Sequence, residues 1–370
     1  MSWFLAFAGF AALIILHEAG HFAAAKAVGM RVERFFLFFP PKLFSFKCGE
    51  TEYGVGMIPL GGFVKITGMN PDEELPEEIA HRGYYHQPVW KRIVVIAAGP
   101  AVNLLIAFVI LFALGFGLSE ATDEVGETAA GAPAEGVLEP GDRVTSIDGV
   151  AVAGLSGATL RETVATQVNE HQCAGEPTDG CRGEEPVELV VVRDGSRQEI
   201  AVRPQYDADV PALEGSGTGR MLIGFSYGTR PAEVSVAGAG EFAADRMWFV
   251  TSRTMGVLAR LFDPEQREQV SGVVGGFEVT RQSIEFDGRQ AVGVLAIISL
   301  SLGVINLFPF LPLDGGHIFW SIVEKIRGRP VPFRIMERSG VIGFMLVILI
   351  FFIGLSNDIG RLSGEGFMVR

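Results

Sequence analysis

Four long apolar segments with few charged residues divide the chain. They cover residues 1–30, 93–119, 291–317 and 340–356. Because about 20 apolar residues span the hydrocarbon core of a bilayer as a helix, each segment is long enough to cross once, the fourth with help from its flanks. The pattern therefore predicts a polytopic α-helical membrane protein with four transmembrane helices.

The polar segment between the first two apolar runs predicts short strands. Within the loop at residues 31–92, residues 51–69 predict a membrane-associated β-hairpin whose strands, 52–58 and 63–67, are joined through 59–62. We expect this hairpin either to offer an exposed edge to an extended substrate or only to pack against the spans. The residues expected to meet a substrate are Gly61, Gly62 and Phe63.

Residues 120–230 predict an inserted β-rich domain. Alternating strands at 187–192 and 198–202 flank Asp194-Gly195, a dipeptide typical of a tight hairpin turn. Residues 131–152 combine a Pro-Gly-Asp turn with a further strand that ends in Asp-Gly. The inserted region therefore predicts one small β-rich module.

The remaining segments predict an amphipathic linker and two short polar stretches. In the linker at residues 231–290, apolar residues recur near helical spacing over 241–262. We expect that helix to lie along the outer membrane face with Trp248 at the interface, although packing on the β-rich module is the alternative. Residues 318–339 are expected to form a loop and residues 357–370 a C-terminal tail.

Composition supports a membrane protein and argues against nucleic-acid binding. The chain has 370 residues, of which 48% are hydrophobic and 20% charged, with a mean hydropathy of +0.33. This is too apolar for a soluble globular chain of that length. Its net charge of −13 also disfavours a nucleic acid as partner, because phosphate binding requires clustered Lys and Arg.

The uneven distribution of charge predicts the orientation in the membrane. Residues 22–92 carry nine Lys and Arg and residues 318–339 carry five, whereas residues 120–290 carry 29 Asp and Glu against 14 Arg and no Lys. Since basic loops stay on the cytoplasmic side, we expect the inserted domain and both termini outside a bacterial inner membrane. The first apolar segment lacks a basic start and a small-residue cleavage site, so we expect it to be retained as a span.

The three cysteines fit this orientation. Cys173 and Cys181 lie on the expected oxidising side, where they form either a disulfide or two unrelated loop thiols, and Cys48 lies on the reducing side. The chain has no CxxC motif, so no cysteine metal site is expected.

An HExxH sequence interrupts the first apolar segment at His17, Glu18 and His21. On a helix, residues four apart share one face, so the two imidazoles can bind one Zn²⁺ while Glu18 reaches the attacking water. The alternative is a pair of core histidines satisfied by hydrogen bonds. Ionisable groups inside a span are costly and usually functional, which favours the metal site.

A zinc site with two histidines needs a further protein ligand. Asp314 follows a 23-residue uncharged run in the third span and precedes two glycines that let the chain turn closely around an ion. We expect Asp314 to be the third ligand, with His317 as the alternative.

The combined motifs resemble the site-2 protease family, in the group of the bacterial regulator of sigma-E protease. They are HEAGH in the first segment, GMIPLGGFVKITGM at 56–69, AGPAVN at 98–103 and NLFPFLPLDGGH at 306–317, in that order. The resemblance implies that His17, His21 and Asp314 hold zinc and that Glu18 is the catalytic base. It further implies that Asn306 fixes the substrate or stabilises the oxyanion.

Two details qualify the resemblance. The second proline after Asn306, Pro312, stands one position later than the family pattern places it, which leaves the ligand set unchanged but makes the local backbone path uncertain. Residues 125–205 resemble a circularly permuted bacterial PDZ domain, and such domains bind peptide ends by strand addition. The alternative for this module is a folded spacer that limits access by size.

The sequence therefore predicts an intramembrane zinc endopeptidase that cuts single-span membrane substrates, with its active site toward the cytoplasmic side. By resemblance, the substrate is an anti-sigma factor or a remnant signal peptide. The first alternative is a non-catalytic PDZ-bearing membrane adaptor on a protease scaffold, which would have lost Glu18 or a ligand. The second is zinc transport, for which the second and fourth spans offer almost no polar path.

Overall fold

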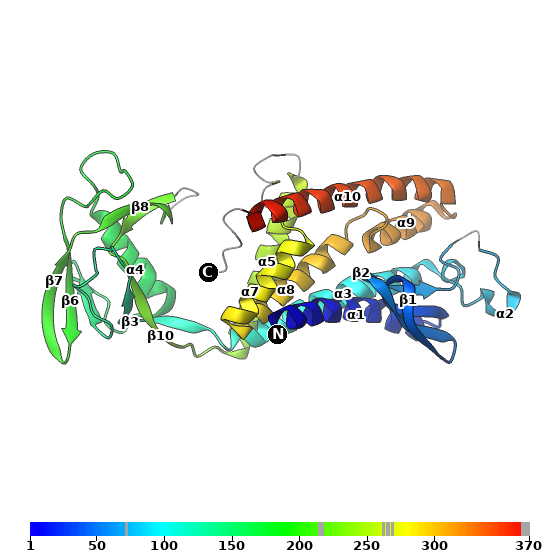
Figure 1. Cartoon of the computed structure of the whole chain (residues 1–370), viewed down its shortest axis with the longest axis horizontal. Coiled ribbons are helices and arrows are strands. Elements are labelled where there is room, and N and C mark those ends of the chain that lie inside the picture. The colour runs from blue at the N-terminus through cyan, green and yellow to red at the C-terminus, as the bar shows by residue number, and fades with distance from the viewer. Residues whose placement is uncertain (71–72, 214–217, 261–262, 264–266, 268–269, 364–370) are drawn as a thin grey trace. The chain divides into compact units, whose positions relative to one another are not determined.

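The computed structural model describes residues 1–70, 73–213, 218–260, 263, 267 and 270–363 (Figure 1). The chain divides into two compact units. Met1–Gly115 and Val236–Arg370 form a mainly helical unit, and Phe116–Ser235 forms a β-rich unit.

The helical unit contains the four predicted membrane spans. Its helices are α1 (Ser2–Ala27), α2 (Glu77–Ala80), the 3-10 helix η1 (Tyr84–His86), α3 (Val89–Gly115), α5 (Val236–Ala259), α7 (Val273–Phe286), α8 (Gly288–Asn306), α9 (Asp314–Arg327) and α10 (Phe333–Ser363). By length and hydropathy, α1, α3, α8 and α10 can each cross a membrane. The prediction of four apolar helices is therefore confirmed.

The third predicted span is shorter than expected. We expected one helix over residues 291–317, but α8 ends at Asn306 and Asp314 begins a separate helix, α9. Pro309 and Pro312 lie between the two helices, and proline removes a helical hydrogen bond and clashes with the preceding turn. The helix α9 also occupies much of the predicted loop at 318–339.

The fourth span continues into the segment predicted as a tail. The helix α10 reaches Ser363, and residues 364–370 lie outside the described residues. Asp358 is fully buried and accepts hydrogen bonds from the backbone N–H groups of Gly272 (3.1 Å) and Gly275 (2.7 Å) at the start of α7. A carboxylate satisfies the free N–H groups at a helix N-terminus, so this contact joins α10 to α7.

The helix α3 is the centre of the helical unit. It packs against α1, α5, α8 and α9, and Figure 1 shows it beside α1. Gly20 makes the contact between α1 and α3 close, because a Cβ atom there would lie 2.6 Å from the carbonyl oxygen of Ala98. The backbones of the two spans therefore approach directly.

The predicted hairpin at residues 51–69 is wrong in its pairing. The strands β1 (Val32–Cys48) and β2 (Thr51–Ile66) form one bent sheet in which residues 34–37 pair with 62–65 on one side and with 52–55 on the other. The two segments expected to pair with each other are thus separated by β1. Aromatic packing favours this arrangement, since the rings of Phe36 and Phe63 stack with centroids 5.4 Å apart.

An ion-pair cluster holds the turn between β1 and β2. Glu50 accepts hydrogen bonds from Arg82 Nη1 (2.7 Å) and Nη2 (2.8 Å) and from Lys26 Nζ (2.5 Å). These bonds, those from Arg82 foremost, lower the pKa of Glu50 to about 2. The cluster ties the sheet to the end of α1.

The β-rich unit matches the predicted inserted module in extent. Its elements are β3 (Ser119–Thr128), β4 (Arg143–Ile147), β5 (Val150–Ala151), α4 (Gly157–Glu170), β6 (Val187–Arg193), β7 (Ser196–Val202), β8 (Gln205–Pro211), β9 (Thr218–Leu222) and β10 (Phe225–Pro231). The main sheet has the order β10-β3-β4-β6-β7, with β5 on β4, and β8 pairs with β9. The predicted turn at Asp194-Gly195 joins β6 and β7, with both residues at positive φ. Cys173 and Cys181 form a disulfide with their Cα atoms 6.1 Å apart.

Candidate metal centre

Two histidines of α1 meet on one face of the helix. His17 and His21 are four residues apart, which places them one turn from each other. Their Nε2 atoms are 3.3 Å apart, and each side chain is only 7% exposed. The helix therefore presents two imidazole nitrogens at a single buried point.

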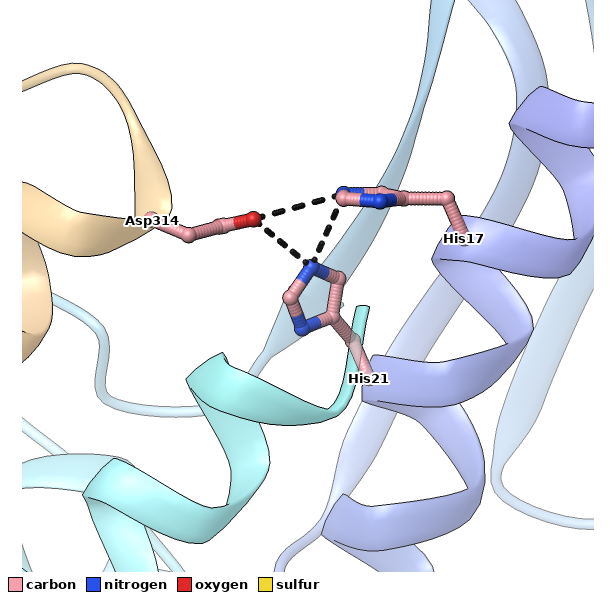
Figure 2. A group of neighbouring side chains, drawn as sticks. All are labelled: His17, His21 and Asp314. Carbon is pink, nitrogen blue, oxygen red and sulfur yellow. Dashed lines mark hydrogen bonds and ion pairs between the residues drawn. The ribbon is translucent and has the colours of Figure 1, made fainter. Parts of the chain in front are cut away.

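Asp314 completes a triangle of candidate ligand atoms. Its Oδ2 atom lies 3.3 Å from the Nε2 atom of His17 and 3.3 Å from that of His21 (Figure 2). Ligand atoms about 2.0–2.1 Å from a tetrahedral zinc ion are about 3.3–3.4 Å from each other. The triangle therefore has the size of one face of a zinc coordination tetrahedron.

The surroundings of the triangle also suit a cation. Asp314 Oδ2 is buried and has no hydrogen-bond partner in the described part of the chain other than the two imidazoles it approaches. A buried carboxylate is costly unless it is paired or binds a metal. Gly99 of α3 leaves the space open, because a Cβ atom there would lie 2.3 Å from His21 Nε2 and 2.9 Å from His17 Nε2.

Two glycines bring Asp314 into position. At Gly315 a Cβ atom would lie 2.2 Å from the carbonyl oxygen of Leu307, and at Gly316 it would lie 2.4 Å from the backbone nitrogen of Leu311. The segment after α8 therefore folds directly against the first turn of α9. This contact explains why the aspartate is followed by two residues without side chains.

The helix α3 holds the other nitrogen of each histidine. His21 Nδ1 lies 2.9 Å from the carbonyl oxygen of Val95, and His17 Nδ1 lies 3.1 Å from Nδ2 of Asn103, which is fully buried. Pro100, between them in α3, cannot donate a helical hydrogen bond and distorts the preceding turn. Such contacts fix the orientation of a metal-binding imidazole.

Sequence reasoning missed this role of α3. Asn103 bonds a neighbouring helix, α1, and its partner there is His17, a candidate metal ligand. The signal that points to it is a lone Asn in an apolar run, four residues after Gly99. No pattern in the sequence indicates that Val95 offers its carbonyl group.

Glu18 lies beside the sheet of β1 and β2, whereas the two histidines contact α3. Glu18 is half-buried. Gly62 lies against it, because a Cβ atom at Gly62 would be 2.9 Å from Cγ of Glu18. The strand segment 62–65 therefore runs beside the glutamate of the HExxH sequence.

Two other predicted residues lie outside the triangle. His317, the alternative third ligand, lines a small cavity with Tyr85, Arg92 and Glu324 and is not part of the metal-binding group. Asn306 ends α8 and is half-buried, and within the described chain it makes no hydrogen bond to the three candidate ligands. The geometry thus places Asp314, and not His317, in the candidate metal-binding group, and the role of Asn306 stays a prediction.

A buried ion pair anchors the helix that carries Asp314. Arg92 of α3 is 2% exposed, and its Nη1 and Nη2 atoms donate to the two carboxylate oxygens of Glu324 in α9, at 3.0 Å and 2.5 Å. The guanidinium group also lies 5.3 Å from the ring centroid of Tyr85. These contacts fix α9 relative to the helix that orients both histidines.

Comparisons with known proteins identify the family of this chain. The model of Peptidase family M50 matches residues 5–350. The zinc metalloprotease Rip1 of Mycobacterium tuberculosis is 34% identical over 341 residues, covering 85% of this chain and 83% of Rip1. Rip1 of Mycolicibacterium smegmatis is 31% identical over 359 residues, covering 90% of this chain and 88% of that protein. The chain therefore belongs to peptidase family M50, the site-2 protease family, and is a membrane-bound zinc metalloendopeptidase.

Proposed function

We propose that this protein hydrolyses peptide bonds within or near the transmembrane segment of single-span protein substrates. The observation that carries the proposal is a buried zinc-sized triangle on an apolar helix. His17 is the sixteenth residue of α1 and so lies about 23 Å from the start of that helix, with about 15 Å remaining to its end. Both distances fall within a hydrocarbon core of about 30 Å, so the site is expected at membrane depth.

The proposed zinc ligands are His17, His21 and Asp314. When bound, zinc polarises the scissile carbonyl and lowers the pKa of water toward about 7. Glu18 accepts the proton of the attacking water and later delivers it to the leaving amine. By family resemblance, the amide of Asn306 donates a hydrogen bond to the developing oxyanion or holds the substrate.

The substrate is proposed to bind in extended form along β2. A helical substrate must unwind first, because its carbonyl groups are engaged in backbone hydrogen bonds. The segment 62–65 pairs with 34–37 on one side, and Gly62 lies against Glu18. We assign Gly61, Gly62 and Phe63 to this binding edge. The rings of Phe36 and Phe39 stack on Phe63 and support it.

The β-rich unit is proposed to control access. Its strand β10 lies at the end of the sheet, paired with β3, so strand addition of a peptide end is possible in the manner of a PDZ domain. The alternative role is a size filter. The charge distribution supports an extracytoplasmic location of this unit and a catalytic site toward the cytoplasmic face of a bacterial inner membrane.

The adaptor alternative receives no support from the residues present. A disabled protease would lack Glu18 or a ligand, whereas Glu18, His17, His21 and Asp314 are all in the chain. The natural substrate, an anti-sigma factor or a remnant signal peptide by resemblance, remains part of the proposal.

Reconstituted protein tests the proposal directly. The purified chain in liposomes, with a model single-span substrate, is compared with Glu18→Gln and with the control Glu162→Gln, an exposed change on α4. Loss of a general base lowers turnover about 10²–10⁴-fold, so the first variant should retain zinc and lose cleavage while the control keeps both. Equal cleavage by native protein and Glu18→Gln would refute the assignment of the base.

A further inference from the structure

Three arginines stand in a row at equal spacing along and just after α5: Arg246 and Arg253 lie in the helix, and Arg260 directly follows its last residue, Ala259. Arg246, Arg253 and Arg260 are seven residues apart, and seven residues make almost two full turns of a helix. The row therefore follows one face and drifts by only about 20° per step. All three side chains are exposed, and residues 246–260 contain no Asp or Glu.

The positive charges of this row have no acidic partner among the residues that the structure describes. None of the three guanidinium groups forms an ion pair with any residue that the structure describes. Arg246 lies over the ring of Phe242 at 5.6 Å and Arg253 over the ring of Phe249 at 5.8 Å. The row contrasts with its surroundings, since residues 120–290 as a whole carry 29 acidic residues against 14 arginines.

The first half of α5 is attached to the end of a membrane span. Ala239 packs against Gly115, the last residue of α3, where a Cβ atom would lie 3.0 Å from the Cα atom of Ala239. Two turns are covered in this way, because Ala243 packs with Leu111 and Ala296.

The second half of α5 exposes large apolar side chains on more than one side. Phe249 is 53% exposed and lies on the side of the arginine row, three residues after Arg246 and four before Arg253. Trp248 (75% exposed) and Met255 (46% exposed) each stand two residues after an arginine and so lie near the opposite side. Trp is enriched where the headgroups meet the hydrocarbon core, and a helix that combines such residues with arginines binds the surface of anionic membranes. The position, the apolar side chains and the unpaired charge thus point to the same environment.

We propose that Arg246, Arg253 and Arg260 bind the phosphate groups of anionic phospholipids while Phe249, which lies between the first two on the same side of the helix, enters the boundary of the acyl chains. Successive arginines are about 10.5 Å apart along the helix, so each binds a separate headgroup. The row fixes the linker between the β-rich unit and α7 at the bilayer surface. This inference does not depend on the proposed cleavage chemistry.

The competing occupant is the protein's own acidic unit. Residues 116–235 carry 21 Asp and Glu against eight Arg, so they also complement the row in charge. Lipid is favoured because the exposed apolar residues of α5 require an apolar neighbour as well as an anionic one.

The test measures lipid binding to the full chain in nanodiscs of neutral phospholipid. A pyrene-labelled anionic phospholipid is titrated in, and energy transfer from tryptophan to pyrene is measured. The part of this transfer that is lost in the variant Trp248→Phe is the signal from Trp248. The triple variant Arg246→Gln/Arg253→Gln/Arg260→Gln is compared with Arg161→Gln/Arg197→Gln/Arg203→Gln, which removes the same charge from exposed positions of the β-rich unit.

A basic residue near an anionic bilayer strengthens binding about fivefold, so the triple variant should raise the half-saturating lipid fraction by up to about 100-fold. The control variant should bind like the native chain, and added salt should weaken native binding through screening. An unchanged lipid titration in the triple variant would overturn the proposal. If that variant also showed altered hydrogen exchange in residues 120–230, the acidic unit would be identified as the occupant.

Discussion

Replacing Asn103 by Leu should weaken zinc binding without removing any metal ligand. The Asn103 amide lies 3.1 Å from Nδ1 of His17 and is fully buried. When zinc binds Nε2 of His17, the proton resides on Nδ1, which must then donate to an acceptor. The Oδ1 atom of Asn103 is buried and has no other partner within the described residues. Exchanging Oδ1 and Nδ2 by a 180° flip of the amide brings this oxygen to Nδ1 of His17, where it supplies that acceptor.

The magnitude follows from the cost of leaving this N–H group unpaired. A buried donor without a partner costs about 1–3 kcal/mol, which corresponds to about a 5- to 140-fold loss in affinity. Measured effects of removing such partners of metal-binding histidines are about 10–100-fold. We therefore expect Asn103→Leu to raise the zinc dissociation constant by about 10- to 100-fold.

The assay is competition for zinc between the detergent-solubilised protein and a fluorescent chelator. Asn103→Asp keeps an acceptor at the same place, so it should bind zinc at least as tightly as the native chain. Ser299→Ala serves as the packing control, because Ser299 Oγ donates to the backbone carbonyl of Asn103 at 3.0 Å and does not involve the amide. Zinc binding by this control should stay near native.

Two results would refute the reasoning. Native zinc affinity in Asn103→Leu would mean that the amide does not orient His17. Equal weakening in Asn103→Asp and Asn103→Leu would mean that shape at this position matters and hydrogen bonding does not.

Three further predictions concern space, anchoring and pH. Gly99→Ala should bind far less than one zinc per chain by elemental analysis, because its Cβ would lie 2.3 Å from the nearest histidine nitrogen. The control Gly293→Ala, whose Cβ would lie 3.6 Å from its closest neighbour, should bind as much zinc as the native chain. Arg92→Met should destabilise the fold by about 1.5–3 kcal/mol in thermal unfolding, since it leaves the half-buried carboxylate of Glu324 without its two charge-assisted hydrogen bonds. The double variant Arg92→Met/Glu324→Leu should recover part of the loss. The pKa of Glu50 is about 2 in the folded state and about 4.3 in the unfolded state. The ionised carboxylate therefore contributes its full stabilisation of the folded state above about pH 4.3. Stability should therefore fall as pH drops from about 4.5 to 2, and Glu50→Gln should flatten that dependence; an equal slope in both proteins would contradict it.

Local features of the chain were sufficient to predict the spans and half of the metal centre. A run of about 20 apolar residues has few alternatives to a membrane helix, because the bilayer core cannot hydrogen-bond an irregular backbone. The spacing of His17 and His21 likewise has a local meaning, since any helix through them places both on one face. These predictions needed no knowledge of which segments pack together.

Contacts between distant segments decided the rest. Asp314 and His317 are three residues apart and both chemically suitable. The packing of α9, through Gly315 and Gly316 and through the pair of Arg92 and Glu324, places the aspartate and not the histidine in the candidate metal-binding group. The pairing of β2 was mispredicted for the same kind of reason, because its partner, β1, is chosen by aromatic contacts across the sheet rather than by a nearby turn. The sequence by itself determined which chemical groups enter the membrane. Tertiary packing, which is set by the shapes of helices far apart in the chain, decided which of those groups meet and how α3 orients them.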